Sequence, residues 1–523
     1  MKGSKKIFTL LMATILLVST LFVGCSKKAD VTTEDPKGEE VATTEAKAEE
    51  AAPTTEAIKE LEPVNLTWYF IGDGEVKDSG MVNEAISAYL KDKINATVDI
   101  IRYDWGSYDT KLSTMIATGE PCDVVFTTSW ALNYKVNAQK GAFLPIDDLL
   151  TQYGQGVVEA LGQEMIDGNR VDGVAYAMPI NKEKAHNMGI LFNKKFVDKY
   201  KFDLSTIKTF ADVEPMAKII SESEPADVLK ESLNVGMNFG SGPIILLDYD
   251  YVSGNAQVPG ALWSNNDASN VTVFNQYATP EFKELITLSR KFYQAGYISP
   301  DAAQEKNDTS AAEGKAFTWF QQLKPGKDVE TSNANASWVQ VDMTKPVMST
   351  SDINNSMVAI SSTSENPERA MMLLNLMYTD KTLLDLVNYG IEGTHYTRID
   401  ENTIEPIADS GYYPAGSVSW QFGDQLKISL KSTEDPDKYK KFLEYNANAT
   451  ILNSLGFSFD ATGLETEYSA LNSVSEEFLP VLLTGSVDPE EYLPKFLDKL
   501  KEAGSEKVIA EIQKQYDAFL AGK

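Results

Sequence analysis

Three tryptophans fall at or just beyond the ends of predicted β-strands, and their chemistry suits the binding of a sugar ring. They are Trp68, Trp105 and Trp130. Trp105 is followed by Gly and Ser, and Trp130 is preceded by Thr-Thr-Ser. A sugar ring stacks its polarised C–H face on an aromatic ring, while short polar side chains bind its hydroxyls. A single tryptophan is more often a packing residue, but three at one sheet edge predict at least one ligand platform.

Later tryptophans supply the predicted opposite side of this site. We expect Trp130 and Trp105 to be opposed by Trp420 or Trp319, and Trp420 has polar neighbours in Ser-Trp-Gln-Phe-Gly-Asp. Asp73 and Thr127, at strand ends, are the predicted partners of ligand hydroxyls.

Catalytic and metal-binding motifs are absent from the sequence. The two histidines, His186 and His395, are far apart, and there is no HExxH, CxxC, GxSxG or glycine-rich phosphate loop. We therefore predict no catalytic residue, no metal and no cofactor. Paired carboxylates like those of a glycosidase stay open as an alternative, because 76 acidic residues always offer candidate pairs.

The first 25 residues are typical of an export leader. Lys2, Lys5 and Lys6 precede an apolar run from Ile7 to Val23, which Gly24-Cys25 follows. The run is shorter than the roughly 20 residues that a membrane-spanning helix needs. Leu21-Phe22-Val23-Gly24-Cys25 resembles the bacterial lipobox, with Phe22 a departure from its usual aliphatic residue. We predict a signal peptide over residues 1–24 and a lipid, such as palmitate, on Cys25.

Composition separates a tether from a folded body. Residues 25–62 consist mostly of Ala, Thr, Glu, Lys, Asp and Pro, which predicts a disordered linker. The whole chain has 523 residues, 43% of them hydrophobic, which predicts two or more domains. Its net charge of −29 argues against nucleic-acid binding. With Cys25 lipidated, Cys122 has no disulfide partner.

Hydrophobic periodicity from Val64 predicts a βαβαβ unit and hence a parallel sheet with helices on its faces. The three strands are expected at 64–70, 97–101 and 123–127, and ligands of such sheets bind beyond the carboxyl ends of the strands. Later strands are expected at 174–178, 188–192 and 357–360. Helices are expected at 211–221, 280–295, 366–377, 464–478, 490–503 and 505–520.

Several stretches resemble family 1 extracellular solute-binding proteins. Gly119–Phe126, Lys140–Leu149 and Val171–Pro179 are similar to that family's first lobe, and Phe192–Lys194 and Asn366–Ala370 fit the same pattern. A narrower resemblance is to a lipoprotein branch with an uncharacterised C-terminal domain. Its motifs are Lys93–Ala96, Tyr389–Tyr396, Gly456–Asp460 and, most specifically, Thr484–Pro494. The resemblance runs from about residue 64 to residue 521. Cys122 is a departure, because the family more commonly has an aromatic or aliphatic residue at that position.

This resemblance implies an α/β, two-lobed type II periplasmic-binding fold with extra C-terminal helices. The first lobe is expected at 64–178 plus about 340–385. The second is expected at 179–339 plus about 386–523, including the C-terminal helical domain. Hinge closure would trap the ligand between the lobes.

The resemblance also implies a function: capture of a carbohydrate, most simply an oligosaccharide, for delivery to the permease subunits of an ABC importer. The expected location is the outer face of the cell membrane, through lipid on Cys25. A peptide receptor, a lipid-anchored glycoside hydrolase and a surface adhesin stay open as alternatives.

Overall fold

The computed structural model describes residues 61–72, 74–235, 242–264, 271–305, 308–333, 335–412 and 418–522. The predicted signal peptide 1–24, Cys25, the tether as far as residue 60 and Asp73 lie outside these residues. Within them, no helix combines the length and apolar character needed to cross a bilayer. Two large hydrophobic cores divide the described chain into two lobes, and a small third cluster surrounds Trp338 on the second lobe. Both lobes belong to one compact unit.

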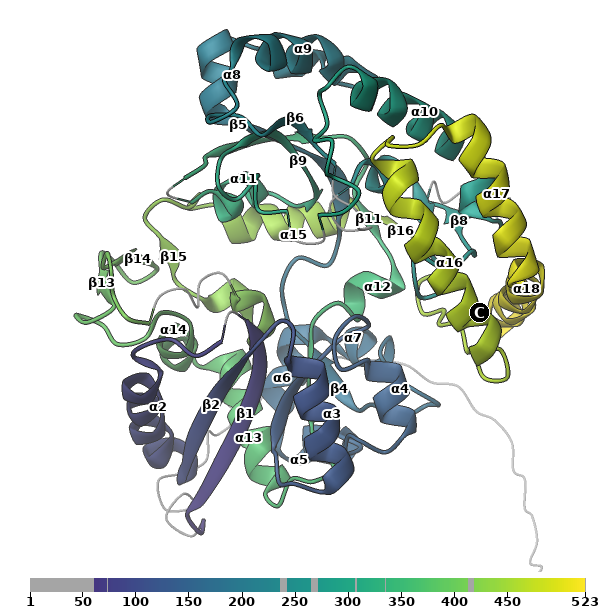
Figure 1. Cartoon of the computed structure of the whole chain (residues 1–523). Helices are drawn as coiled ribbons and strands as arrows, with labels where there is room; N and C mark the ends of the chain where they lie inside the picture. Colours follow the sequence, from purple (N-terminus) through teal and green to yellow (C-terminus); the bar gives the residue numbers. More distant parts are fainter. Residues whose placement is uncertain are drawn as a thin grey trace, which may run out of the picture. The chain divides into compact units, whose positions relative to one another are not determined.

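The first lobe is built on a five-stranded sheet in the order β2-β1-β3-β12-β4 (Figure 1). Its strands are β1 (Val64–Gly72), β2 (Ala96–Asp104), β3 (Val124–Thr127), β4 (Ala177–Pro179) and β12 (Met357–Ile360). β1 runs parallel to β2 and β3, which confirms the expected βαβαβ unit. β12 is antiparallel to both β3 and β4, so the complete sheet is mixed.

Helices cover the first sheet because each carries an apolar stripe at helical spacing. In α2 the buried residues are Val82, Ile86, Leu90 and Ile94. The helices of this lobe are α2 (Ser79–Ile94), α3 (Tyr108–Thr118), α4 (Tyr134–Gln139), α5 (Asp147–Tyr153), α6 (Gln155–Leu161), α7 (Gln163–Asp167), α13 (Pro367–Thr379) and α14 (Lys381–Tyr389).

The second lobe has a four-stranded sheet in the order β10-β5-β9-β6. Its strands are β5 (Asn187–Asn193), β6 (Glu231–Asn234), β9 (Ala316–Leu323) and β10 (Trp338–Asp342). Its helices are α8 (Lys194–Tyr200), α9 (Glu214–Ser223), α10 (Pro280–Gln294), α11 (Lys327–Thr331) and α15 (Lys438–Asn448). Two short strand pairs join β7 (Tyr249–Asp250) to β8 (Leu262–Trp263) and β11 (Val347–Met348) to β16 (Thr450–Ile451).

The three expected C-terminal helices are present and share the second lobe's core. They are α16 (Glu465–Leu483), α17 (Pro489–Glu502) and α18 (Ser505–Gly522), and α16 and α17 pack beside α10 (Figure 1). The extra helices are therefore part of the second lobe's hydrophobic unit.

One boundary differs from the expectation that residues from about 386 belong to the second lobe. Buried apolar side chains between Val387 and Ile428 join the first core instead. The segment forms a small sheet of β13 (Tyr396–Arg398), β14 (Thr403–Pro406) and β15 (Leu430–Lys431). Tyr389 donates from its hydroxyl to Ser429 O at 2.6 Å, which ties the segment to α14. The described chain thus passes between the lobes around 181–187, 344–356 and 429–444.

Candidate ligand-binding site

Three tryptophans from distant parts of the chain form one aromatic cluster on the first lobe. The ring of Trp105 stacks against those of Trp130 and Trp420, with centroids 6.2 and 6.3 Å away. The rings of Trp130 and Trp420 are 6.0 Å apart. Trp105 and Trp130 are 51% and 46% exposed. Large apolar rings that stay half-exposed are not fully used in packing, so this surface can accept a flat ligand face.

Short polar side chains hold the first two tryptophans at the ends of their strands. Trp105 follows β2 in a turn where Asp104 accepts hydrogen bonds from Gly106 N at 3.1 Å and from the Ser107 hydroxyl. Trp130 follows β3, and its backbone N–H donates to Thr128 Oγ1 at 2.7 Å. Its indole Nε1 donates to Asn355 Oδ1 at 2.9 Å, which fixes the ring beside the second passage between the lobes, just before β12.

Trp420 reaches the cluster because its two neighbours are anchored on β1. It lies in a short 3-10 helix, Ser419–Gln421. The fully buried carboxamide of Gln421 accepts from Ile71 N at 3.2 Å and donates to Ile71 O at 2.7 Å. Phe422 packs edge-on against Trp68 and Phe70, at 5.4 and 5.0 Å. These contacts place a residue some 350 positions away beside the end of the first strand.

Two of the expected ligand contacts lie elsewhere in the structure. Thr127 is fully buried, and its hydroxyl donates to Leu132 O at 2.7 Å, so it braces the loop of Trp130 from below. Trp319 packs against Trp338 at 5.7 Å on the second lobe and does not join the aromatic cluster. Trp68 is fully buried in the core. Asp73 lies outside the described residues.

A polar wall, formed by the second lobe and the first passage between the lobes, lines a cavity of about 240 Å³ together with Trp130 and Trp420. A cavity of about 350 Å³, which Trp130 also lines, adjoins it. The smaller cavity is lined by Gln321 and Gln322 at the end of β9. It is also lined by the charged side chains Lys182, Glu183, Lys324, Lys327 and Glu330. Sequence reasoning missed this wall. The available signal was the polar Gln-Gln-Leu-Lys at the end of an otherwise apolar strand.

The three lysines and two glutamates of the polar wall form a chain of ion pairs that leaves one net positive charge. Glu183 lies 2.8 Å from Lys182 and 3.3 Å from Lys324, and Lys324 lies 2.8 Å from Glu330. Burial by itself raises the pKa of the Glu183 carboxyl, but Lys182 and Lys324 outweigh it and lower the pKa below its ordinary value. Glu183 therefore stays ionised, and the wall offers fixed hydrogen-bonding groups with little net charge.

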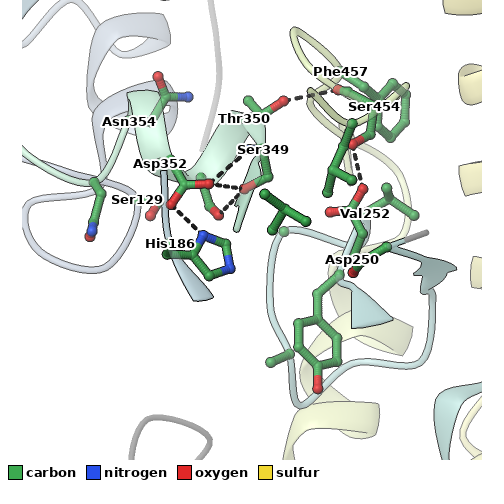
Figure 2. Close-up of a pocket in the computed structure, with 18 of the residues that line it drawn as sticks. Ser129, His186, Asp250, Val252, Ser349, Thr350, Asp352, Asn354, Ser454 and Phe457 are labelled. Carbon is green, nitrogen blue, oxygen red and sulfur yellow. Dashed lines mark hydrogen bonds and ion pairs between the residues drawn. The ribbon is translucent and has the colours of Figure 1, made fainter. Parts of the chain in front are cut away.

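The larger cavity is continuous in its lining with the smaller one, because Trp130, Gln322 and Asn355 line both. Figure 2 shows its polar lining, where His186 Nδ1 lies 2.6 Å from Asp352 Oδ1 and Asp250 bonds to Ser454. Burial raises the pKa of Asp250 to about 6. Hydroxyl and amide groups of Ser129, Ser349 and Asn354 complete this side. Such a lining suits a ligand rich in hydroxyls.

The described residues hold no group of three or more His, Cys, Asp or Glu side chains able to bind a metal ion. The site combines aromatic faces on the first lobe with hydrogen-bonding groups across the cavity. That arrangement can bind and orient an amphipathic ring, with its flat face on tryptophan and its rim toward the polar wall.

Two segments of the chain match known protein families. Residues 73–382 match the family described as bacterial extracellular solute-binding protein. Residues 453–521 match DUF3502, a domain of unknown function. A carbohydrate ABC transporter substrate-binding protein from Streptococcus pneumoniae is 32% identical over 448 residues, covering 83% of this chain and 87% of that protein.

Solved structures agree with this assignment. The N-glycan transport solute binding protein NgtS from S. pneumoniae has a TM-score of 0.77 at 29% identity, covering 88% of this chain and 99% of that one. Its complex with Man1GlcNAc has a TM-score of 0.75 at 28% identity, covering 88% and 100%. The alginate-binding protein AlgQ2 shares the fold alone. Its TM-score is 0.58 at 14% identity, and the match covers 88% of this chain and 99% of that one. The resemblance seen in the sequence is confirmed, and the chain belongs to the bacterial extracellular solute-binding proteins.

Proposed function

We propose that this chain is a lipid-anchored receptor that captures a neutral oligosaccharide and delivers it to an ABC import permease. The observation that carries the proposal is the cluster of Trp105, Trp130 and Trp420, of which Trp130 and Trp420 share a cavity with a polar wall whose charges are largely paired. Aromatic faces supply stacking area for sugar rings, and the wall supplies hydrogen bonds without favouring an ionic ligand. The family membership supports extracytoplasmic solute capture, and Cys25 would keep the receptor beside its transporter.

The relatives narrow the ligand class that we propose. The S. pneumoniae relative is a carbohydrate substrate-binding protein, and NgtS has been solved with Man1GlcNAc and Man5GlcNAc. We propose that the ligand here is likewise an oligosaccharide of mannose and N-acetylglucosamine. A peptide ligand fits less well. The lysines and glutamates of the wall already pair with one another and so are not available to bind the charged termini of a peptide.

A glycoside hydrolase is the second candidate, favoured by one observation. Asp250 has a pKa raised to about 6 and lies in the cavity beside Trp130, as a general acid would. Against it, the Asp250 carboxylate is bonded to Ser454 and the second acid, Asp352, is held by His186. We propose binding without turnover.

The test is calorimetry and thermal shift of the exported chain against a glycan panel that includes Man1GlcNAc and Man5GlcNAc, with peptides as the comparison set. At ligand near 100 times the Kd, about 2.7 kcal/mol of added stability is expected. The glycans should be recovered intact after prolonged incubation. If reducing ends accumulate with time, the hydrolase function replaces the receptor function. If only peptides stabilise the protein, the carbohydrate proposal is wrong.

A further inference from the structure

The C-terminal domain begins with a loop that is built into the second lobe. The domain match starts at residue 453, and the loop Ser454–Phe459 lies between that point and α16. Phe457 packs edge-on against Tyr516 of α18 at 5.2 Å, and Phe459 stacks on Tyr468 of α16 at 6.3 Å. Both phenylalanines belong to the second lobe's core. The loop must therefore move with that lobe.

The same loop separates the larger cavity beside Trp130 from a neighbouring cavity of about 300 Å³. Four residues line both spaces: Thr350, Asn354, Phe457 and Ser458. These four residues border both cavities, Phe457 and Ser458 from the loop and Thr350 and Asn354 from the second passage between the lobes, and we call them the partition. Figure 2 shows Thr350 and Phe457 at this side of the larger cavity.

Hydrogen bonds hold the partition from two directions. Thr350 Oγ1 donates to Ser454 O and accepts from Gly456 N, both at 2.9 Å, which ties the loop to α12 (Thr350–Ile353). From the first lobe, Lys135 Nζ donates to Ser458 O and Phe459 O, both at 3.2 Å. Lys135 lies on α4, five residues after Trp130. One ammonium thus joins the aromatic side of the cleft to the C-terminal domain.

We propose that the loop Ser454–Phe459 is the end wall of the ligand cavity, locked by Lys135, and that the C-terminal domain thereby limits the size of the glycan bound. The inference rests on the proposed function, because it assumes that the cavity beside Trp130 receives part of the glycan. While the loop is held in place, a glycan that enters the larger cavity past Trp130 can extend only as far as Phe457. When the loop is released from Lys135, a larger glycan can extend into the neighbouring cavity.

The experiment compares the Kd for Man1GlcNAc with the Kd for Man5GlcNAc in the full exported chain. Lys135→Ala removes both bonds to the loop, and Thr350→Val removes the hydroxyl at nearly constant volume. Lys140→Ala, an exposed lysine just after α4, is the matched control. Since one or two hydrogen bonds are lost, affinity for Man5GlcNAc should rise by about threefold to tenfold relative to Man1GlcNAc in both variants. Lys140→Ala should leave the ratio unchanged.

The outcomes distinguish this inference from the proposed function. An unchanged ratio in both variants, with binding of the glycans intact, would show that the loop does not bound the site and would leave the receptor function standing. Equal losses of affinity for both glycans would assign Lys135 a purely structural role and also overturn the inference. If the unaltered chain binds neither glycan, both this inference and the proposed function are wrong.

Discussion

At the scale of single residues, each tryptophan of the cluster depends on a polar neighbour for its place. Asp104 fixes the turn of Trp105, Thr128 and Asn355 fix Trp130, and Gln421 fixes the segment of Trp420. Aromatic rings supply binding area, and hydrogen bonds of the neighbouring polar groups set where these rings lie. Residues without any ligand contact are therefore expected to control affinity.

The tryptophan platform gives the first prediction. Trp130→Ala and Trp105→Ala should each weaken glycan binding by on the order of 2 kcal/mol, because each removes a stacked ring. Both rings are about half exposed, so melting temperature should change little. Calorimetry and thermal denaturation measure the two effects. The core residue Trp68 is the control, and Trp68→Ala should cost roughly 3–5 kcal/mol of stability. A large loss of stability with intact affinity at both exposed positions would identify them as packing residues.

Gln421 gives a second prediction at this scale. Gln421→Leu fills a similar volume but leaves Ile71 N and O without their carboxamide partner. A buried backbone group without a partner costs about 1–3 kcal/mol, so stability should fall by about that amount. Glycan affinity should fall too, since Trp420 loses its anchor. Affinity equal to that of the unaltered chain, in a protein that is measurably less stable, would argue that Trp420 does not contribute to binding.

At the scale of elements, the segments that pass between the lobes are tied to each other. His186 and Val347 exchange two backbone hydrogen bonds, at 2.9 and 2.8 Å, and His186 also pairs with Asp352 of α12. The first and second passages therefore behave as one double-stranded connection. Such a connection can bend while keeping its register, which is what a hinge between two rigid lobes requires.

The pair of His186 and Asp352 predicts a pH dependence of stability. Burial lowers the pKa of His186, but Asp352 outweighs burial and raises the pKa above 6.5, with Asp250 adding to this effect and Lys182 opposing it. The folded state thus holds the proton more tightly than the unfolded chain. The stabilisation is fully present below pH 6.5 and is lost as pH rises through the folded-state pKa.

The measurement is thermal denaturation of the unaltered chain and of His186→Gln between about pH 6 and about pH 9. The unaltered chain should exceed the variant in melting temperature most at the acidic end, with the difference shrinking as pH rises. A difference that stays constant over this range would show that the ion pair does not titrate there.

At the scale of the whole molecule, two hydrophobic cores meet at a polar cleft. Among the residues that the structure describes, each hydrophobic cluster is confined to one lobe, and we expect the lobes to be able to change their separation. Ligand that contacts both the tryptophans and the polar wall favours the closed arrangement. Small-angle X-ray scattering should show a smaller radius of gyration on addition of a binding glycan. An unchanged radius at saturating glycan would contradict closure and favour an open adhesive surface.

The proposed lipid anchor on Cys25 also concerns the whole chain. Cys25→Ala should release the exported protein from the membrane fraction while the melting temperature of the body stays the same, because the predicted tether separates the two. Fractionation and metabolic labelling with a fatty-acid analogue measure this. Label that persists on the Cys25→Ala chain would place the lipid elsewhere.

The sequence by itself determined the βαβαβ unit and the C-terminal helices, and its resemblance to a known family implied the two lobes. Local periodicity is enough to predict the βαβαβ unit, since each strand and helix there carries its own apolar pattern. The same reasoning put Trp105 and Trp130 at one sheet edge, because the carboxyl ends of neighbouring parallel strands meet at one edge. Both were predictions from residues close in the chain.

Only the tertiary structure decided what lies across from these two tryptophans. Trp420 joins them through Gln421, whereas Trp319 pairs with Trp338, and the segment from Val387 to Ile428 packs with the first core. Thr127 turns inward to brace a loop, and the polar wall forms from β9 and α11. The polar Gln-Gln-Leu-Lys at the end of β9 and the polar neighbours of Trp420 are visible in the sequence, but neither shows which element lies opposite. Periodicity shows which face of an element is apolar, but the choice of partner depends on contacts between residues hundreds of positions apart.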